Sequence, residues 1–342
     1  MAQSMDIARF VNPAITASTD ELAERFRAAR PFRHVVIDQF LTPSFCREIC
    51  EAFPKFEDGA SLNEDGQPGG KATQEKVRAL GPAFERIDDL LQGPEFLGLV
   101  ERITGVRELR YDPWYFGGGT HENIEGQDLD PHVDFNYHPI TRQHRRLNLI
   151  VYLNDEWRDD WGGSLQLHHD PYLEPDEDEI VTVTPLMNRC VIFETSERSW
   201  HGFRRIKLPP EDSHRSRKSF AVYFYTDSRP AEETADEHST VYVERHLPDR
   251  FVPGRVLDQA DVDELKGLLA RRDHHLRRLY RNVQEVNGKL NQSWFFSAEM
   301  QMRRRVYELE NSLSWRITAP LRFLKRGLRR LGGRGDPSQK DG

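Results

Sequence analysis

Three residues in the middle of the chain have the types and the spacing of a metal site. His132 and Asp134 lie two residues apart in an extended segment, and alternate side chains of a strand point to the same face. His201 follows 67 residues after Asp134, just beyond another strand signal. Two histidines and one carboxylate on one face leave three coordination positions open. That arrangement suits non-haem Fe(II), which must hold an oxidant and O2 together. His132, Asp134 and His201 are therefore the predicted metal ligands and catalytic residues.

A His-x-Asp pair alone is a weak signal, because two polar residues at a strand edge give the same pattern. Arg217 favours the metal site, because it stands directly before an apolar strand. A buried guanidinium there can hold the distal carboxylate of a 2-oxoacid through two hydrogen bonds. Ser219 shares a strand face with Arg217, so its hydroxyl can join the same carboxylate.

Short strands are the elements that must position these residues. Between residues 107 and 228, β-branched and aromatic segments alternate with Gly, Pro and Asp turns, which predicts a β-sandwich or barrel. The clearest strand signals are Leu147–Leu153, Ile180–Thr184, Cys190–Phe193 and Phe220–Tyr225.

Residues 1–106 carry mainly helix signals around one strand. Helices are expected near 42–53, 82–92 and 94–104, and a strand over 34–40. Segment 55–73 is rich in Gly, Asp, Glu and Lys, which predicts a mobile loop.

Seven pieces of this region resemble the prolyl-4-hydroxylase-like branch of the Fe(II)/2-oxoglutarate dioxygenases and occur in that family's order. They are Tyr115–Gly119, Pro131–Phe135, Arg145–Asn154, Trp161–Leu167, Asn188–Phe193, His201–Gly202 and Arg217–Tyr225. The resemblance covers about residues 30–228. It implies an α+β fold with a mainly β core, a double-stranded β-helix (jelly roll) over about 107–228. N-terminal helices of about 1–106 would buttress it, giving a dioxygenase domain over 1–230.

The resemblance also implies roles for individual residues. His132, Asp134 and His201 match the iron ligands, and Arg217 matches the residue that pairs with the 5-carboxylate of 2-oxoglutarate. Three further residues are predicted to line the cofactor pocket. Tyr152 matches a carboxylate-binding tyrosine, Asn148 shares its strand face, and Tyr115 matches a pocket tyrosine.

The implied activity is hydroxylation of an unactivated C–H bond, with release of succinate and CO2. Its cofactors would be Fe(II), 2-oxoglutarate and O2, with ascorbate as a candidate reductant. Asp134 favours hydroxylation, since related halogenases have a small residue there. The expected substrate is a protein side chain, prolyl-like, or a cell-surface glycan, lipid-linked or soluble. Candidate substrate contacts, each with a packing role as the alternative, are Phe135, Tyr137, His138 and His121.

The remainder of the chain changes character after residue 230. A linker is expected over 231–254, and apolar residues seven apart over 262–290 predict a helical hairpin or short coiled coil within a helical region 255–331. Homo-oligomerisation through 262–290 is a candidate use of it. The first of the two apolar series that form this heptad seam is Val262, Leu269, Leu276, Val283 and Leu290. The second is Leu265, Leu279 and Val286, interrupted by Arg272 and Ser293.

The C-terminal end mixes Trp, Phe and Leu with Arg and Lys. Over 313–331 this favours an amphipathic helix on an anionic membrane surface, with a flexible basic tail as the alternative. Ser314–Arg322 resembles endings of bacterial cell-surface polysaccharide glycosyltransferases. Residues 332–342 are expected to be disordered.

Composition sets further bounds. The 342 residues carry a net charge of −8, so nucleic acid is not an expected partner. No apolar run approaches the ~18 residues of a transmembrane helix. Three cysteines make no disulfide framework, and Cys46 and Cys50 suit one helix face better than a zinc knuckle. These features predict a cytoplasmic protein, peripheral on the inner face of the membrane if the tail binds lipid.

Two alternatives keep the fold and change the function. One is a catalytically inactive jelly-roll binding module tethered by the coiled coil and the membrane-surface tail. The other is a zinc or manganese cupin-type enzyme, although such sites usually have more histidine ligands and do not need Arg217.

Overall fold

A computed structural model describes residues 6–56, 60–62, 68–173, 176–243, 247, 250–310 and 312–318. The chain divides into two compact units, Met1–Asp249 and Arg250–Gly342. Of the predicted basic amphipathic end, residues 319–331 lie outside the described residues, as does the tail 332–342.

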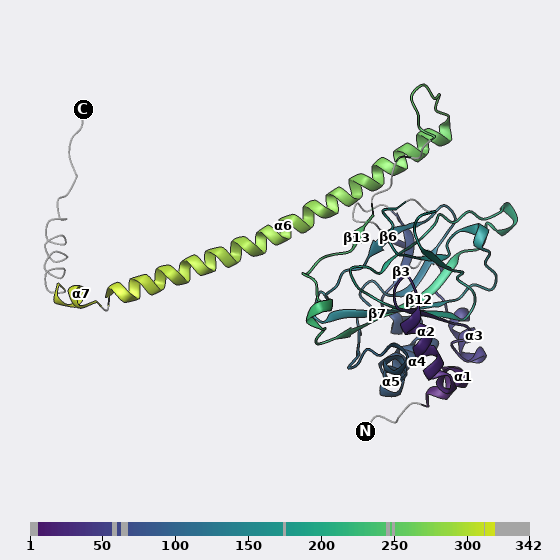
Figure 1. The fold of residues 1–342 in the computed structure, drawn as a ribbon, viewed down its shortest axis with the longest axis horizontal. Coiled ribbons are helices and arrows are strands. Elements are labelled where there is room, and N and C mark those ends of the chain that lie inside the picture. The colour runs from purple at the N-terminus through teal and green to yellow at the C-terminus, as the bar shows by residue number, and fades with distance from the viewer. Residues whose placement is uncertain are drawn as a thin grey trace, which may run out of the picture. The chain divides into compact units, whose positions relative to one another are not determined.

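Short helices form one layer of the first unit. They are α1 (Pro13–Ala17), α2 (Thr19–Ala28), α3 (Pro43–Glu51), α4 (Pro82–Gln92) and α5 (Pro94–Thr104), with 3-10 turns at Ile7–Arg9 and Val77–Leu80. Four of them begin with proline in the first turn, where its missing N–H costs nothing. Figure 1 shows these helices gathered on one side of the strands.

The larger sheet carries the helices. Within the described residues its strand order is β1-β10-β7-β12-β5-β3-β2, with β4 also paired to β12. The strands are β1 (His34–Ile37), β2 (Ala60–Leu62), β3 (Pro68–Gln74), β4 (Arg110–Tyr111), β5 (Gly119–Asn123), β7 (His144–Tyr152), β10 (Arg189–Glu194) and β12 (Arg217–Thr226). Phe84 of α4 and Phe96 of α5 pack against Phe220 and Phe224 of β12, with ring centroids 6.0 and 6.4 Å apart.

The smaller sheet has the order β13-β6-β11-β8-β9. Its strands are β6 (Leu129–Val133), β8 (Leu165–His168), β9 (Ile180–Val183), β11 (Trp200–Phe203) and β13 (Val241–Tyr242). Leu167 and Val183 of this sheet share an apolar cluster with Tyr152 and Phe193 of the larger one. Two antiparallel sheets packed face to face agree with the predicted jelly roll, and 3-10 turns at Asp159–Trp161, Pro210–Asp212 and Ala231–Glu233 lie in its loops.

Alternation along β7 and β12 separates two environments. The core shared with the helices takes every second residue of each strand, namely Leu147, Leu149 and Val151 of β7 and Phe220, Val222 and Phe224 of β12. The intervening residues of these strands therefore face the smaller sheet. That face includes Asn148 and Tyr152 on β7 and Ser219 and Tyr223 on β12, which pair directly across the two strands.

Two predictions about irregular segments were wrong. Segment 55–73 was expected to be a loop, but β3 pairs with β5 along Lys71–Gln74 and so widens the larger sheet. Residues 231–254 were expected to be a linker, but β13 pairs with β6 of the smaller sheet. Glu233 also forms ion pairs with Arg33 and Arg146, which fixes the start of this segment to the β core.

The second unit is helical. α6 (Gln259–Glu310) is one continuous helix of 52 residues, so the predicted hairpin was wrong, and α7 (Leu313–Ile317) follows it. Asp261 in the first turn of α6 binds Arg250 and Arg255. The heptad-seam residues Leu269, Leu279 and Val286 are more than half exposed, so the coiled coil stays a prediction. No helix among the described residues is long and apolar enough to span a bilayer.

Candidate metal and cofactor site

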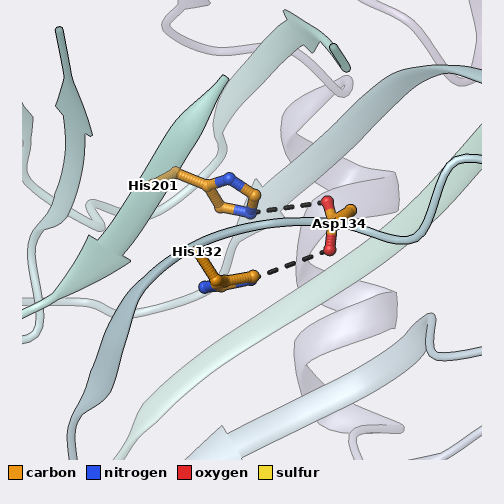
Figure 2. A group of neighbouring side chains, drawn as sticks. All are labelled: His132, Asp134 and His201. Atoms are coloured by element: carbon orange, nitrogen blue, oxygen red, sulfur yellow. Dashed lines mark ion pairs between the residues drawn. The ribbon is translucent and has the colours of Figure 1, made fainter. Parts of the chain in front are cut away.

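His132, Asp134 and His201 come together between the two sheets (Figure 2). His132 on β6 and His201 on β11 are directly paired across neighbouring strands, and their ring centroids lie 4.3 Å apart. Asp134 follows the end of β6. One ligand atom from each of the three residues lies within 4.8 Å of the others. The predicted ligands thus form one cluster of three protein donors.

Backbone contacts fix both imidazole rings. Nδ1 of His132 donates to the Asp130 carbonyl at 2.8 Å, and Nδ1 of His201 donates to the Ser199 carbonyl at 2.9 Å. A carbonyl oxygen only accepts, so the proton of each neutral ring is on Nδ1. Each Nε2 atom therefore keeps its lone pair and faces a carboxylate oxygen of Asp134. The distance from Nε2 to that oxygen is 3.7 Å for His132 and 3.5 Å for His201. This is the tautomer and orientation that metal-binding histidines need.

Asp134 is anchored from the larger sheet. Its Oδ2 atom accepts a hydrogen bond from the Asn148 amide at 2.8 Å and lies 3.0 Å from Nη2 of Arg145. The Arg145 guanidinium also donates to Oδ1 of Asn148. It lies over the rings of Tyr223 and Phe135, at 3.6 and 4.5 Å from their centroids. A cation that is held on two faces and along its edge has little freedom to leave Asp134.

The electrostatics of the cluster favour metal binding. Burial, together with neighbouring His201, lowers the pKa of His132 to about 3, and burial lowers the pKa of His201 as well. Burial alone would raise the pKa of Asp134. The positive charge of Arg145, the two neighbouring histidines and the hydrogen bond from Asn148 outweigh that effect and lower the pKa of Asp134. Near neutral pH the site therefore presents two neutral imidazoles and one carboxylate, which is the donor state that a divalent cation requires.

Arg217 is a buried cation beside this cluster, 5% exposed. Its Nε atom donates to the Gly163 carbonyl at 2.5 Å, and Nη2 lies 3.3 Å from the Tyr152 hydroxyl. Its guanidinium carbon lies 4.3 Å from the ring centroid of Phe203, two residues after His201 on β11. Among the described residues, no carboxylate forms an ion pair with Arg217. A buried charge without a partner is costly, so this position suits an anionic ligand.

Cross-strand register places further polar residues beside Arg217. Lys71 on β3 and Arg217 on β12 both pair with Asn123 on β5, so the three lie in one row. The next row on the same face contains Thr73, His121, Ser219 and Tyr152. Burial and the nearby Arg217 lower the pKa of Lys71 to about 8. Ser219 and Tyr152 thus lie on the same face as Arg217, and their cofactor roles stay predictions.

The remaining predicted residues lie at different places relative to the three ligands. His121 faces the inner side, and burial and the charges of Lys71 and Arg217 hold its pKa well below the usual value. Phe135 contacts Arg145 and Phe116. Nδ1 of His138 instead accepts two backbone hydrogen bonds in its own turn, from residues 140 and 141.

Two aromatic residues lie apart from the three ligands. The Tyr137 ring packs on His144, with centroids 4.6 Å apart. The Tyr115 hydroxyl donates to Asp88 of α4 at 3.0 Å, within the core shared with the helices. The structure does not bring either residue to the three ligands, and the predicted cofactor role of Tyr115 gains no support from this contact.

Sequence reasoning missed Arg145 and Lys71. Arg145 lay in a segment that resembled the family, but no role was assigned to it. Lys71 lay in the segment interpreted as a loop. Regular alternation would place Arg146 rather than Arg145 on the face of Asn148, so the sequence contains no signal for Arg145.

Comparisons with known proteins agree with this geometry. A family model described as the 2OG-Fe(II) oxygenase superfamily matches residues 119–225, which include His132, Asp134, His201 and Arg217. This stretch, about a third of the chain, is similar to the 2OG-Fe(II) oxygenase superfamily. The sequence-based family prediction is confirmed. Fe(II) and 2-oxoglutarate are its implied cofactors, and the donor set of the triad and the unpaired buried Arg217 fit them.

Individual relatives are more distant. The oxygenase is 28% identical over 160 residues to prolyl 3-hydroxylase OGFOD1 of Mus musculus, a match that spans 42% of the oxygenase and 26% of that relative. The chain thus spans about a quarter of the length of this curated relative.

Two solved structures are similar at low identity. A prolyl hydroxylase of Trichoplax adhaerens, in complex with a peptide fragment of the hypoxia inducible factor oxygen degradation domain, matches with a TM-score of 0.44 and 15% identity. That match covers 63% of the oxygenase and 94% of the other chain. A prolyl 4-hydroxylase of Phytophthora capsici matches with a TM-score of 0.44 and 18% identity, over 80% and 77% of the two chains.

Proposed function

We propose that the oxygenase hydroxylates an unactivated C–H bond, with consumption of O2 and 2-oxoglutarate and release of succinate and CO2. The observation that carries this proposal is the combination of a His-Asp-His cluster with a buried, unpaired arginine on the adjoining sheet face. The triad has three protein donors, which leaves positions for a chelating 2-oxoacid and O2. Arg217 supplies the charge that a distal carboxylate needs.

The residues of the site would have separate roles. His132, Asp134 and His201 would hold Fe(II), which supplies the activation of O2 when it is bound. Arg217 and the Tyr152 hydroxyl would bind the far carboxylate of 2-oxoglutarate, and Ser219 lies in the same row as Tyr152.

The surrounding residues keep these groups in place. Arg145 and Asn148 hold Oδ2 of Asp134, which also faces Nε2 of His201, while Oδ1 faces Nε2 of His132. Phe193 and Phe203 contact His201 and Arg217 and exclude water from that end of the site.

We infer that the substrate is a protein side chain, with a prolyl residue as the first choice. The support is the similarity to a relative named a prolyl 3-hydroxylase. The surroundings of Asp134 suit an apolar ring. Phe135 contacts Arg145, and Phe116, with its ring centroid 5.4 Å from that of Phe135, is 41% exposed. Aromatic faces of this kind pack well against a pyrrolidine ring.

The test is coupled turnover by the full-length protein reconstituted anaerobically with Fe(II). Succinate formation from 2-oxoglutarate is followed by NMR, while proline-containing peptide pools and soluble glycans are searched by mass spectrometry for a gain of one oxygen. We expect succinate formation that is lost in His132→Ala and lowered in Arg217→Met, and product in the peptide arm. Product in the glycan arm alone would overturn the choice of substrate class. Absence of succinate with iron bound would favour the inactive binding module.

A further inference from the structure

Three sulfur atoms meet on the helix-bearing side of the larger sheet. Cys46 and Cys50 lie one turn apart on α3, so their side chains share a helix face. The Sγ atoms of Cys46 and Cys50 lie 3.7 and 3.5 Å from Sδ of Met187. Cys46 belongs to the core between helices and sheet, whereas the triad lies on the opposite, inner face of that sheet. This sulfur cluster is therefore separate from the iron site.

The cluster is rigidly held although Met187 is far from α3 in sequence. The side-chain amide of Asn188 donates to the Leu41 carbonyl at 2.8 Å, and its Oδ1 accepts from the Leu41 N–H at 2.8 Å. The backbone N–H of Asn188 donates to the Tyr152 carbonyl. These bonds fix the turn that carries Met187 to the segment directly before α3. The three sulfurs are thus positioned before any ligand arrives, which lowers the entropy cost of binding one.

Access also suits a ligand. Cys50 and Met187 are half-buried, which leaves an ion a route from solvent. The third cysteine differs in this respect, since Cys190 is fully buried within β10.

We propose that Cys46, Cys50 and Met187 form a binding site for a soft monovalent cation, Cu(I). Thiolate and thioether ligands select Cu(I), whereas zinc takes four donors and prefers nitrogen, oxygen or thiolate to thioether. A three-coordinate centre with metal–sulfur bonds of ~2.3 Å holds its sulfurs ~4 Å apart, close to the separations observed here. Binding replaces two thiol protons by one Cu⁺ ion. Both protons pass to solvent and no electron is transferred.

The test uses reduced full-length protein under anaerobic conditions. Cu(I) is supplied as its bicinchoninate complex, and loss of that complex's visible absorbance reports transfer to the protein, with Zn(II) titrated in parallel. We expect one equivalent of Cu(I) to transfer, together with an ultraviolet thiolate-to-copper band. Cys46→Ala and Cys50→Ala should abolish transfer, and Met187→Leu should weaken it at least ~10-fold, since it removes one ligand but keeps the side-chain volume.

Cys190→Ala is the matched control, because it removes the one cysteine outside the cluster. It should keep full transfer. Cys50 is half-buried, so Cys50→Ala also covers the case in which Cys46→Ala does not fold, as judged by thermal unfolding. No transfer to the intact protein would overturn the proposal. So would equal loss in Cys190→Ala, or Zn(II) binding in preference to Cu(I).

Discussion

Nη2 of Arg145 lies 3.0 Å from Oδ2 of Asp134, and Asn148 donates to the same oxygen. One oxygen of the proposed iron-binding carboxylate is thus already engaged by the protein. The other oxygen, Oδ1, lies 3.7 Å from Nε2 of His132 and takes neither of these two bonds, while the engaged Oδ2 lies 3.5 Å from Nε2 of His201. This arrangement favours a carboxylate that gives the metal one oxygen and leaves the remaining positions to 2-oxoglutarate and O2.

Arg145→Met tests this role. Methionine fills the slot between Tyr223 and Phe135 but releases Oδ2. Removing the positive charge of Arg145 does not weaken the attraction of the site for a metal cation. The freed Oδ2 of Asp134, however, can take up one of the metal's open coordination positions. We expect metal binding to persist, measured with Mn(II) by EPR, while turnover falls ~10–100-fold and 2-oxoglutarate binds the metal-loaded protein more weakly.

The matched control is Arg146→Met, which removes the neighbouring buried arginine. Arg146 pairs with Glu194 and Glu233, and both of these stay paired with Arg33. This variant should keep metal binding and turnover. The contrary outcome is that Arg145→Met loses metal binding and thermal stability together, with no selective weakening of 2-oxoglutarate binding. That result would indicate a purely structural role for Arg145.

Arg217→Met should separate binding from stability. Loss of a charge-assisted contact of ~3 kcal/mol weakens 2-oxoglutarate binding roughly a hundredfold. Arg217 lacks an acidic partner among the described residues, so its replacement should also raise the unfolding temperature of the ligand-free protein. The measurement is thermal unfolding with and without 2-oxoglutarate in the presence of Mn(II). A variant that is less stable without ligand contradicts the proposed unpaired charge.

The sequence could predict the parts of the site that depend on simple alternation. His132 and Asp134, and likewise Arg217 and Ser219, are two apart, so period two places each pair on one face. If side chains alternated regularly along β7 from Asn148 toward its start, Arg146 would point inward. A register shift opposite β12 pairs Leu147 with Phe224 but Arg145 with Tyr225, so Arg145 takes the inward position instead.

The position of Lys71 could not be predicted for a different reason. Its segment has the composition of a loop, and its strand forms only because β5 offers a free edge far along the chain. Gly119 on β5 allows that approach, since a Cβ atom there would lie 2.0 Å from the Gln74 carbonyl oxygen. Such pairings depend on tertiary structure, which local composition does not report.

The pH dependence of stability follows from the buried histidines. In metal-free protein the pKa of His132 is lowered to about 3 by burial and His201, while in the unfolded chain it is ~6.5. Between these values the unfolded chain binds more protons, so the free energy of unfolding rises with pH through this window. The contribution of His132 to the free energy of unfolding is lost as the pH falls from ~6.5 toward 3. Urea unfolding in EDTA should show this slope, and His132→Asn should flatten it. An unchanged slope would rule out His132 as its source.

Gly163→Ala should disturb the Arg217 pocket. Gly163 has φ +71°, and an added Cβ would lie 2.9 Å from the Trp157 ring and 3.2 Å from Cδ of Arg217. Gly126→Ala is the matched control, because Gly126 has φ +83° with open space around it. In both variants, backbone strain should lower the free energy of unfolding by ~1–2 kcal/mol. In Gly163→Ala, overpacking should lower it by a further ~1–3 kcal/mol, and 2-oxoglutarate should bind more weakly. Equal effects in both variants, measured by urea unfolding and ligand titration, contradict the packing argument.

The exposed face of α6 gives the last prediction. Leu276 and Val283, consecutive members of the first series of the heptad seam, are 42% and 47% exposed. Apolar positions seven apart on a long helix favour pairing with a second helix, and a second copy of the chain supplies the same seam. We expect the full-length protein to dimerise at micromolar concentration, and Leu276→Ser combined with Val283→Ser to shift it to monomer. Leu309→Ser, an exposed leucine of α6 beyond the seam, is the control and should leave the dimer intact. Light scattering after size exclusion gives the mass directly. A monomer at all concentrations, or a dimer that is insensitive to the double substitution, would mean that the seam does not mediate self-association.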